Sequence, residues 1–160
     1  MTQLSPHFSL NEMIRSDTGT RLGIDNTPTD EHLKNLVLVC ENVLEPVRKV
    51  FGRVRVNSGY RSLALNMAIN PMTSTINKLS KHCTGQAVDF EVDGIPNAQI
   101  AAWCVANLPD FDQIILEFYT PGEPNSGWVH GGYVVGKQRK EVFTAVRENG
   151  KTVYKVGLIA

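Results

Sequence analysis

The N-terminal part of the chain has the hydrophobic period of helices. Ser9-Leu10-Asn11-Glu12 matches a capping box, in which a serine and a glutamate three residues later begin a helix. Farther along, apolar residues recur at steps of three and four between Leu33 and Val47, which gives one apolar face. Thr29 precedes this segment as an N-cap, and Pro46 is expected to disturb the helix near its C-terminal end. The pattern therefore predicts helices as the first elements of the fold.

Beyond Gly52 the period changes from helical to alternating, which is typical of strands. Strands are predicted at 54–56, 86–92, 111–118 and 128–135, short helices at 63–68 and 96–107, and a polar loop at 70–81. Asn149-Gly150 predicts the turn of a C-terminal hairpin at 141–155. Helices followed by mainly antiparallel strands indicate an α+β fold, with the N-terminal helices packed on a small sheet. We expect one domain over 1–160 with its motif-bearing core at about 53–135.

Composition and charge exclude several functional classes. The chain has 160 residues, and its sixteen Lys and Arg balance sixteen Asp and Glu. A nucleic-acid-binding protein normally carries a cationic surplus, so neither nucleic acid nor an anionic membrane surface is an expected partner. The N-terminus lacks the basic and apolar segments of a secretory signal, and no apolar run is long enough to span a membrane. These features predict a protein that is made in the cytoplasm.

Two of the four histidines, His82 and His130, are candidates for metal binding. His82 ends the polar loop, and Asp89 lies in a strand on the face opposite its apolar stripe. If the strands at 111–118 and 128–135 pair, Glu117 and His130 share a face. Two imidazoles and one carboxylate are a ligand set for catalytic zinc, with Glu117 left over as a general base. The spacing alone leaves open that Asp89 faces water and that His130 is a structural residue.

Three ordered segments resemble one enzyme family. Residues 80–89 match the signature SxHxxGxAxD, residues 58–62 read SGYRS, and residues 111–118 with 128–130 resemble a third block. These segments are similar to the zinc D-Ala-D-Ala peptidase family, the LAS metallopeptidases, which also include lysostaphin-type enzymes and the hedgehog signalling domain. The stretch from residue 8 to 28 is similar to phage-type members. The resemblance therefore implies a hedgehog or D-Ala-D-Ala peptidase-like fold.

The resemblance also implies roles for the candidate residues. His82, Asp89 and His130 would bind one Zn²⁺ per chain. Glu117 would act as the general base for the attacking water and later as the proton donor to the leaving amine. Arg61 would stabilise the oxyanion of the tetrahedral intermediate or hold a substrate carboxylate, because a guanidinium is a fork of donors with a fixed charge.

Two further residues are assigned roles by weaker resemblance, and the sequence departs from the family pattern at one point. Ser80 and Gln86 would be substrate-binding residues or hydrogen-bond donors behind the ligands. Many relatives place the glutamate only a few residues before the last histidine, whereas thirteen positions separate Glu117 from His130 here. Glu123, in the loop between them, is therefore the alternative base.

The implied function is hydrolysis of a peptide bond in the peptidoglycan stem peptide or cross-link, with a phage endolysin as the expected biological role. Such an enzyme would act as a monomer and stay in the host cytoplasm until its release to the cell wall or periplasm. The resemblance does not select the bond that is cleaved, nor an endopeptidase over a carboxypeptidase. Three alternatives remain: a zinc-stabilised binding module, a virion structural domain, and a thiol peptidase that uses Cys83.

Overall fold

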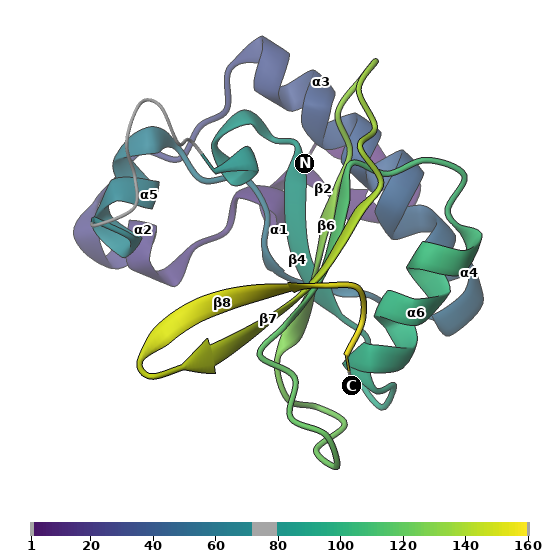
Figure 1. Ribbon diagram of the computed structural model, residues 1–160. Helices are drawn as coiled ribbons and strands as arrows, with labels where there is room; N and C mark the ends of the chain where they lie inside the picture. Colours follow the sequence, from purple (N-terminus) through teal and green to yellow (C-terminus); the bar gives the residue numbers. More distant parts are fainter. Residues whose placement is uncertain (1, 72–79, 160) are drawn as a thin grey trace.

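The computed structural model describes residues 2–71 and 80–159 (Figure 1). Residues 72–79, which make up most of the loop predicted at 70–81, lie outside the described residues. Within the described ranges, no helix is long and apolar enough to cross a membrane. The elements confirm an α+β fold, in which helices precede a six-stranded sheet.

The chain begins with a small hairpin and two short helices. The hairpin consists of β1 (Gln3–Ser5) and β2 (Phe8–Ser9), and it was not anticipated from the sequence. The predicted capping box begins α1 (Leu10–Ile14): the Ser9 hydroxyl accepts from the Glu12 backbone N–H, and the Glu12 carboxylate accepts from the Ser9 backbone N–H. A second unanticipated helix, α2 (Asp17–Leu22), is short because Gly23 ends it in the left-handed conformation.

The predicted long helix forms, and its disturbance at Pro46 has a defined geometry. It consists of α3 (Asp30–Val39), a π-helical turn η1 (Cys40–Leu44) and α4 (Glu45–Phe51). The Glu45 N–H bonds to the Cys40 carbonyl five residues back, which is the wider spacing of a π-turn. This wider turn directly precedes Pro46, whose ring would clash with a carbonyl in a regular α-helix. Gly52 ends the helix as predicted.

Six strands form the main sheet in the described part of the chain. They are β3 (Arg55–Ser58), β4 (Ala87–Glu91), β5 (Gln113–Glu117), β6 (Trp128–Gly132), β7 (Glu141–Glu148) and β8 (Lys151–Val156), in the order β3-β4-β6-β5-β7-β8. The remaining elements are α5 (Leu63–Ile69), the 3₁₀ helix η3 (Lys81–Thr84) and α6 (Asn97–Asn107). Every pairing is antiparallel except that of β5 with β7. The predicted C-terminal hairpin is β7–β8, and it extends forward from the sheet (Figure 1).

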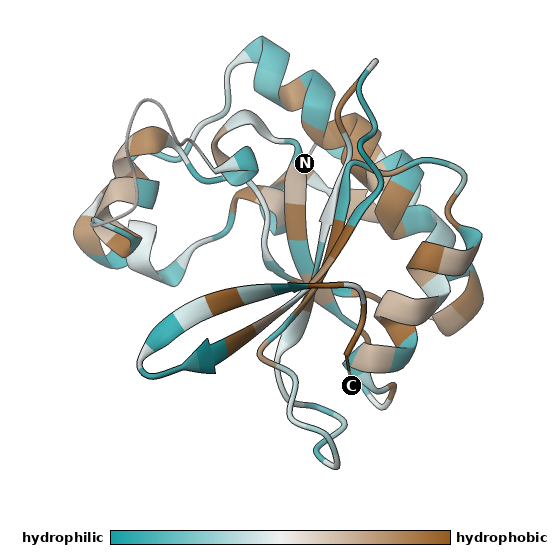
Figure 2. Cartoon of the chain, viewed as in Figure 1, coloured by the Kyte–Doolittle hydropathy of each residue, from teal (hydrophilic) through white to brown (hydrophobic). Residues whose placement is uncertain are grey.

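One face of the sheet is buried beneath α3, α4 and α6 (Figure 1). These helices carry mixed apolar and polar positions, as expected for helices with one buried face (Figure 2). On the strands, Val88, Phe90 and Val129 have no solvent exposure. Because side chains alternate along a strand, Asp89 and His130 project from the opposite face. The core thus fixes which face of the sheet carries the candidate chemistry.

The connection from β6 to β7 passes across the end of β5 and is held by a charged pair. Arg139 donates from Nε to Asp112 Oδ1 and from Nη2 to Asp112 Oδ2, each at 2.7 Å. The Asp112 side chain is only 2% exposed. The adjacent Lys140 N–H bonds to the Phe111 carbonyl. This clamp starts β7 beside β5, so that the hairpin lies next to the strand that carries Glu117.

Candidate metal centre

His82 is held by the backbone segment that contains Gly59. The Ser80 hydroxyl caps η3 by accepting from the His82 backbone N–H, at 3.2 Å. Nδ1 of the His82 ring lies 2.7 Å from the Gly59 carbonyl oxygen, to which it donates. This bond fixes the ring orientation and leaves Nε2 as the free ligand atom. The side chain is 3% exposed, so the ring has little room to rotate.

Gly59 can hold His82 because it has no side chain. A Cβ atom at this position would lie 2.3 Å from the Met13 carbonyl oxygen. The following residue, Tyr60, donates its N–H to the same Met13 oxygen at 2.6 Å. Arg61 then donates its N–H to the His82 carbonyl at 3.1 Å. Residues 58–61 (SGYR) therefore form a backbone bracket that links α1 to His82.

Asp89 and His130 are brought together by strand register. They are directly opposite each other on β4 and β6. His130 Nδ1 lies 3.0 Å from Asp89 Oδ1, and His82 Nε2 lies 3.3 Å from the same oxygen. One ligand atom from each of the three residues lies within 4.8 Å of the others, and all three side chains are largely buried.

The donor set and its spacing fit zinc. Around a tetrahedral Zn²⁺ with bonds of about 2.0–2.1 Å, neighbouring ligand atoms are roughly 3.3–3.5 Å apart. The separations of 3.0 and 3.3 Å from Asp89 Oδ1 are close to that range. Two neutral imidazoles and one carboxylate also match a catalytic site with a fourth position left open. These three side chains could therefore hold the ion after small adjustments.

Burial and the neighbouring charged groups act in opposite directions on the pKa values of Asp89 and His130. Burial by itself would raise the pKa of Asp89, but the charge on His82 and the hydrogen bonds from His130 and His82 outweigh it and lower that pKa. Burial would lower the pKa of His130, whereas the hydrogen bond and charge of Asp89 raise it. Asp89 is therefore ionised at neutral pH and is available as an anionic ligand.

Glu117 lies on the same face as the cluster, two residues along β5 from the position opposite His130. On β5 it is opposite Trp128, while Ile115 is opposite His130. Burial and then the negative charge of Asp89 raise the pKa of Glu117 to about 7, with the charge of His130 acting in the other direction. A carboxyl group with a pKa near neutrality can both accept and donate a proton at physiological pH.

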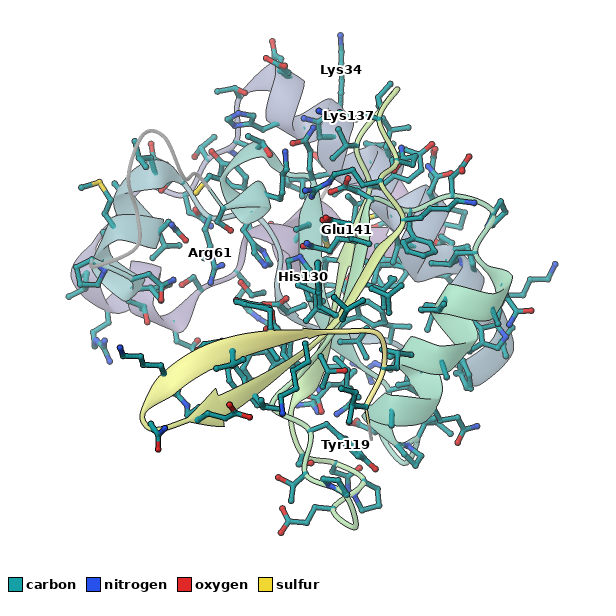
Figure 3. The ribbon with its side chains drawn as sticks, in the orientation of Figure 1. Lys34, Arg61, Tyr119, His130, Lys137 and Glu141 are labelled. Carbon is teal, nitrogen blue, oxygen red and sulfur yellow. The ribbon has the colours of Figure 1, made fainter. Side chains whose placement is uncertain are left out.

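Arg61 borders the cluster from the SGYR segment. Figure 3 shows Arg61 on the side of the sheet where His130 lies. The guanidinium is half-buried, and its Nε has no hydrogen-bond partner among the described residues. Its positive charge acts to lower the pKa of both Glu117 and His130. A buried donor without a partner is unusual in a folded protein, which makes Arg61 a candidate for ligand binding.

The other candidates from the sequence have environments that suit a catalytic role less well. The Gln86 side-chain oxygen accepts from the Thr84 hydroxyl at 2.6 Å. Glu123 is exposed in the loop between β5 and β6, and its N–H bonds to the Thr120 carbonyl. Cys83 is buried, and burial raises the pKa of its thiol. A thiol with a raised pKa is a poor nucleophile, so its environment counts against a thiol peptidase.

Sequence reasoning missed Tyr154, which lies on the hairpin outside the expected core. The register runs from Glu117 on β5 through Ala145 on β7 to Tyr154 on β8. Opposite residues share a face, so Glu117, Ala145 and Tyr154 lie in one row across the sheet. Burial and then the charges of Glu117 and Asp89 raise the pKa of Tyr154. Only the parallel pairing of β5 with β7 reveals this position, and no local signal in the sequence predicts that pairing.

Comparison with known proteins places the chain in a family. Residues 6–118 match the family described as Peptidase M15, so the match includes His82, Asp89 and Glu117. Among solved structures, the chain is similar to the vancomycin resistance D,D-pentapeptidase VanY E175A mutant from a VanB-type resistance cassette, crystallised in complex with Zn(II). That similarity has 22% identity and a TM-score of 0.42, and covers 63% of this chain and 71% of VanY. No curated protein matches the chain. From the family match over residues 6–118, the chain belongs to the peptidase M15 family, the zinc D-Ala-D-Ala peptidases that its motifs resemble.

Proposed function

We propose that this protein is a zinc-dependent peptidoglycan peptidase that hydrolyses a peptide bond of the stem peptide or cross-link. The observation that carries the proposal is the convergence of three buried ligand atoms, a carboxyl group with a pKa near 7 and an unpartnered guanidinium on one face of the sheet. Membership of the peptidase M15 family supports the reaction class. His82, Asp89 and His130 would hold one Zn²⁺ per chain.

The residues around the ion have separate tasks. Zinc, when bound, supplies a Lewis acid that lowers the pKa of a water molecule to about 7. Glu117 takes the proton of the attacking water on its carboxylate and gives it to the nitrogen of the leaving amine. Its raised pKa suits both steps because a carboxyl group that titrates near neutrality can both accept the proton of the water and donate it to the amine. This shuttle needs Glu117 to be ionised when the substrate binds.

Arg61 stabilises the negative charge that develops on the substrate carbonyl oxygen. Its Nε is buried without a partner in the described part of the chain, so binding a substrate oxygen satisfies a donor that is otherwise unmet. Such a preorganised donor acts more strongly on the developing oxyanion than on the neutral carbonyl. Ser80 and Gln86 would then support the site through the bonds that hold η3 and the segment leading into β4.

We further propose that the protein is a phage endolysin that acts as a monomer, on the basis of the resemblance of residues 8–28 to phage-type members. Such a protein would accumulate in the host cytoplasm and reach the cell wall or periplasm when the inner membrane is opened. Expression in a Gram-negative host tests this role. We expect lysis only when the membrane is permeabilised, whereas a virion structural domain would cause none.

Digestion of purified peptidoglycan tests the activity. Mass spectrometry of the fragments should show new amino and carboxyl termini at one type of peptide bond, and the fragment masses identify that bond. Chelation with EDTA should abolish the release of fragments, and added Zn²⁺ should restore it. A zinc-loaded protein that releases no fragment would instead support the binding-module alternative.

A further inference from the structure

A cavity of about 430 Å³ lies beside the candidate metal centre, between the start of α2, the strand β3 and the end of α5. Figure 1 shows α2 and α5 together on the side of the sheet opposite α4 and α6. The lining includes Ser58, Tyr60 and Arg61, which belong to the bracket that holds His82. The cavity therefore adjoins the metal centre through this segment, because Ser58 is opposite the ligand Asp89 in the pairing of β3 with β4 and Gly59 accepts a hydrogen bond from His82.

The charged lining of this cavity is mostly cationic. Arg15, Arg55 and Arg61 line it, whereas Asp17 is its single carboxylate. Arg55 is partly neutralised, because its guanidinium lies 3.3 Å from both Glu91 and Asp93. Within the described residues, neither Arg15 nor Arg61 forms an ion pair, so neither guanidinium is bound to a carboxylate there.

We propose that this cavity is a subsite for a free carboxylate of the substrate peptide, bound by Arg15, with Arg61 adding positive charge where the cavity adjoins the metal centre. The proposal rests on the function proposed above and names the substrate group that the site recognises. An extended peptide advances about 3.3 Å per residue, so a residue close to the scissile bond reaches the cavity when that bond lies at the metal centre. A guanidinium binds a carboxylate through two parallel hydrogen bonds, which no apolar side chain can satisfy.

Two carboxylates of the stem peptide are the candidates compared for this cavity. One is the α-carboxylate of a glutamyl residue that is linked through its side chain, and the other is the carboxylate at the C-terminus of the peptide. Both present the same chemistry to the cavity, so the experiment has to distinguish them. The net charge of the chain is zero, so recognition of an anionic group has to come from a local arrangement such as this one.

Binding of synthetic stem peptides to the zinc-loaded Glu117→Gln variant tests the proposal, because this variant is expected to leave the peptide intact. Three peptides are compared by calorimetry: the free acid, the form amidated at the glutamyl α-carboxylate, and the form amidated at the C-terminus. We expect one of the two amides to bind about tenfold more weakly than the free acid. The amide that loses affinity identifies the carboxylate in the cavity.

Substitutions in the lining assign that difference to the cavity. Added to the same background, Arg15→Gln should weaken binding of the free acid about tenfold and remove the difference between acid and amide. Asp17→Asn removes the one negative charge of the lining and should tighten binding of the free acid about threefold. Arg48→Gln, on α4 outside the lining, serves as the matched control and should change neither affinity. Arg15 is exposed, so its replacement should not affect folding.

The subsite would be overturned if the parent variant bound the acid and both amides equally, or if Arg15→Gln kept the full difference between them. If peptide binding to the parent variant is too weak to measure, the ratio of KM for the acid and amide substrates of the wild-type enzyme gives the same comparison. Failure of the proposed function has a different signature, because the wild-type protein would then release no fragment from peptidoglycan.

Discussion

Among the single residues, Glu117 has the environment that matches its proposed role most directly. Burial and the charge of Asp89 raise the pKa of its carboxyl group to about 7. Glu117→Gln keeps the shape of the side chain but cannot accept a proton. We expect the cleavage rate to fall by about 10²–10⁴-fold while the bound zinc stays at the wild-type level. Fragment release and metal content of the purified variant measure the two effects.

The control for this substitution is Glu123→Gln in the exposed loop, which should leave the rate unchanged. If Glu123→Gln removed the activity and Glu117→Gln did not, the general base would be the loop glutamate that the sequence offered as the alternative. Loss of zinc from Glu117→Gln would instead make this residue a ligand or a support for the ligands.

Gly59 affects both the packing against α1 and the orientation of the metal ligand His82. A Cβ atom there would overlap the Met13 carbonyl, so Gly59→Ala has to move the bracket away from α1. We expect the free energy of unfolding to fall by about 1–3 kcal/mol. Because the Gly59 carbonyl also orients His82, zinc affinity should fall by about 10–100-fold. Urea unfolding and competition with a zinc chelator measure the two losses.

Gly19→Ala provides the comparison, since a Cβ atom at this helical glycine meets its nearest neighbour at 3.4 Å, an ordinary contact. It should change stability little and leave zinc affinity unaltered. Equal zinc affinity in Gly59→Ala and the wild type would show that the bracket does not control the orientation of the His82 ring.

Among the elements, the clamp between Asp112 and Arg139 makes stability depend on pH. Burial would raise the pKa of Asp112, but the hydrogen bonds and charge of Arg139 lower it. A carboxyl group with a lowered pKa in the folded state stabilises the fold above its unfolded pKa of about 3.9, and this contribution is lost as pH falls further. Arg139→Gln should therefore destabilise the fold at pH 7, by about 1–3 kcal/mol.

The difference between wild type and Arg139→Gln should shrink as pH falls below about 4, because Asp112 then becomes protonated in the wild type as well. Urea unfolding at a series of pH values measures it. Lys140→Gln is the matched control, since Lys140 and Asp110 are both exposed and 3.7 Å apart. A difference that stays constant down to pH 3 would show that Arg139 acts through packing rather than through the charge of Asp112.

The elements also show how far the sequence determines the site. The alternation around Asp89 correctly predicts that this residue projects from the face opposite Val88 and Phe90, because burial of apolar side chains fixes the register of a strand. The pairing of β5 with β6, expected as a condition for bringing Glu117 and His130 together, is present. These two features could be predicted from the sequence because each follows from the alternation of side chains along a strand.

The parts that were missed depend on contacts between distant segments. The parallel pairing of β5 with β7 depends on the clamp at Asp112 and on a crossing connection, neither of which leaves a periodic signal. The position of Tyr154 follows from that pairing. Likewise, the cavity beside the metal centre arises where α2, β3 and α5 meet, and α2 itself is too short for its hydrophobic period to be recognised.

For the whole molecule, the candidate metal centre joins two parts of the fold. His82 lies in η3 on the bracket that contacts α1, whereas Asp89 and His130 lie on the sheet. An ion bound to all three residues cross-links these parts, and it binds only when the fold is intact. Metal binding should therefore raise the stability of the entire chain as well as enable catalysis.

Removal of zinc tests this coupling. At a free zinc concentration 100 times the dissociation constant, binding adds about 2.7 kcal/mol of stability, which corresponds to a rise in Tm of roughly 5–10 °C for a domain of this size. EDTA should lower Tm by that amount and abolish cleavage, and Zn²⁺ should restore both. His82→Ala should have a Tm that does not respond to zinc, whereas Cys83→Ala should keep both the zinc-dependent rise in Tm and the activity. A Cys83→Ala variant that binds zinc but cleaves nothing would support the thiol-peptidase alternative. A Tm that rises with zinc equally in His82→Ala would place the ion elsewhere in the chain.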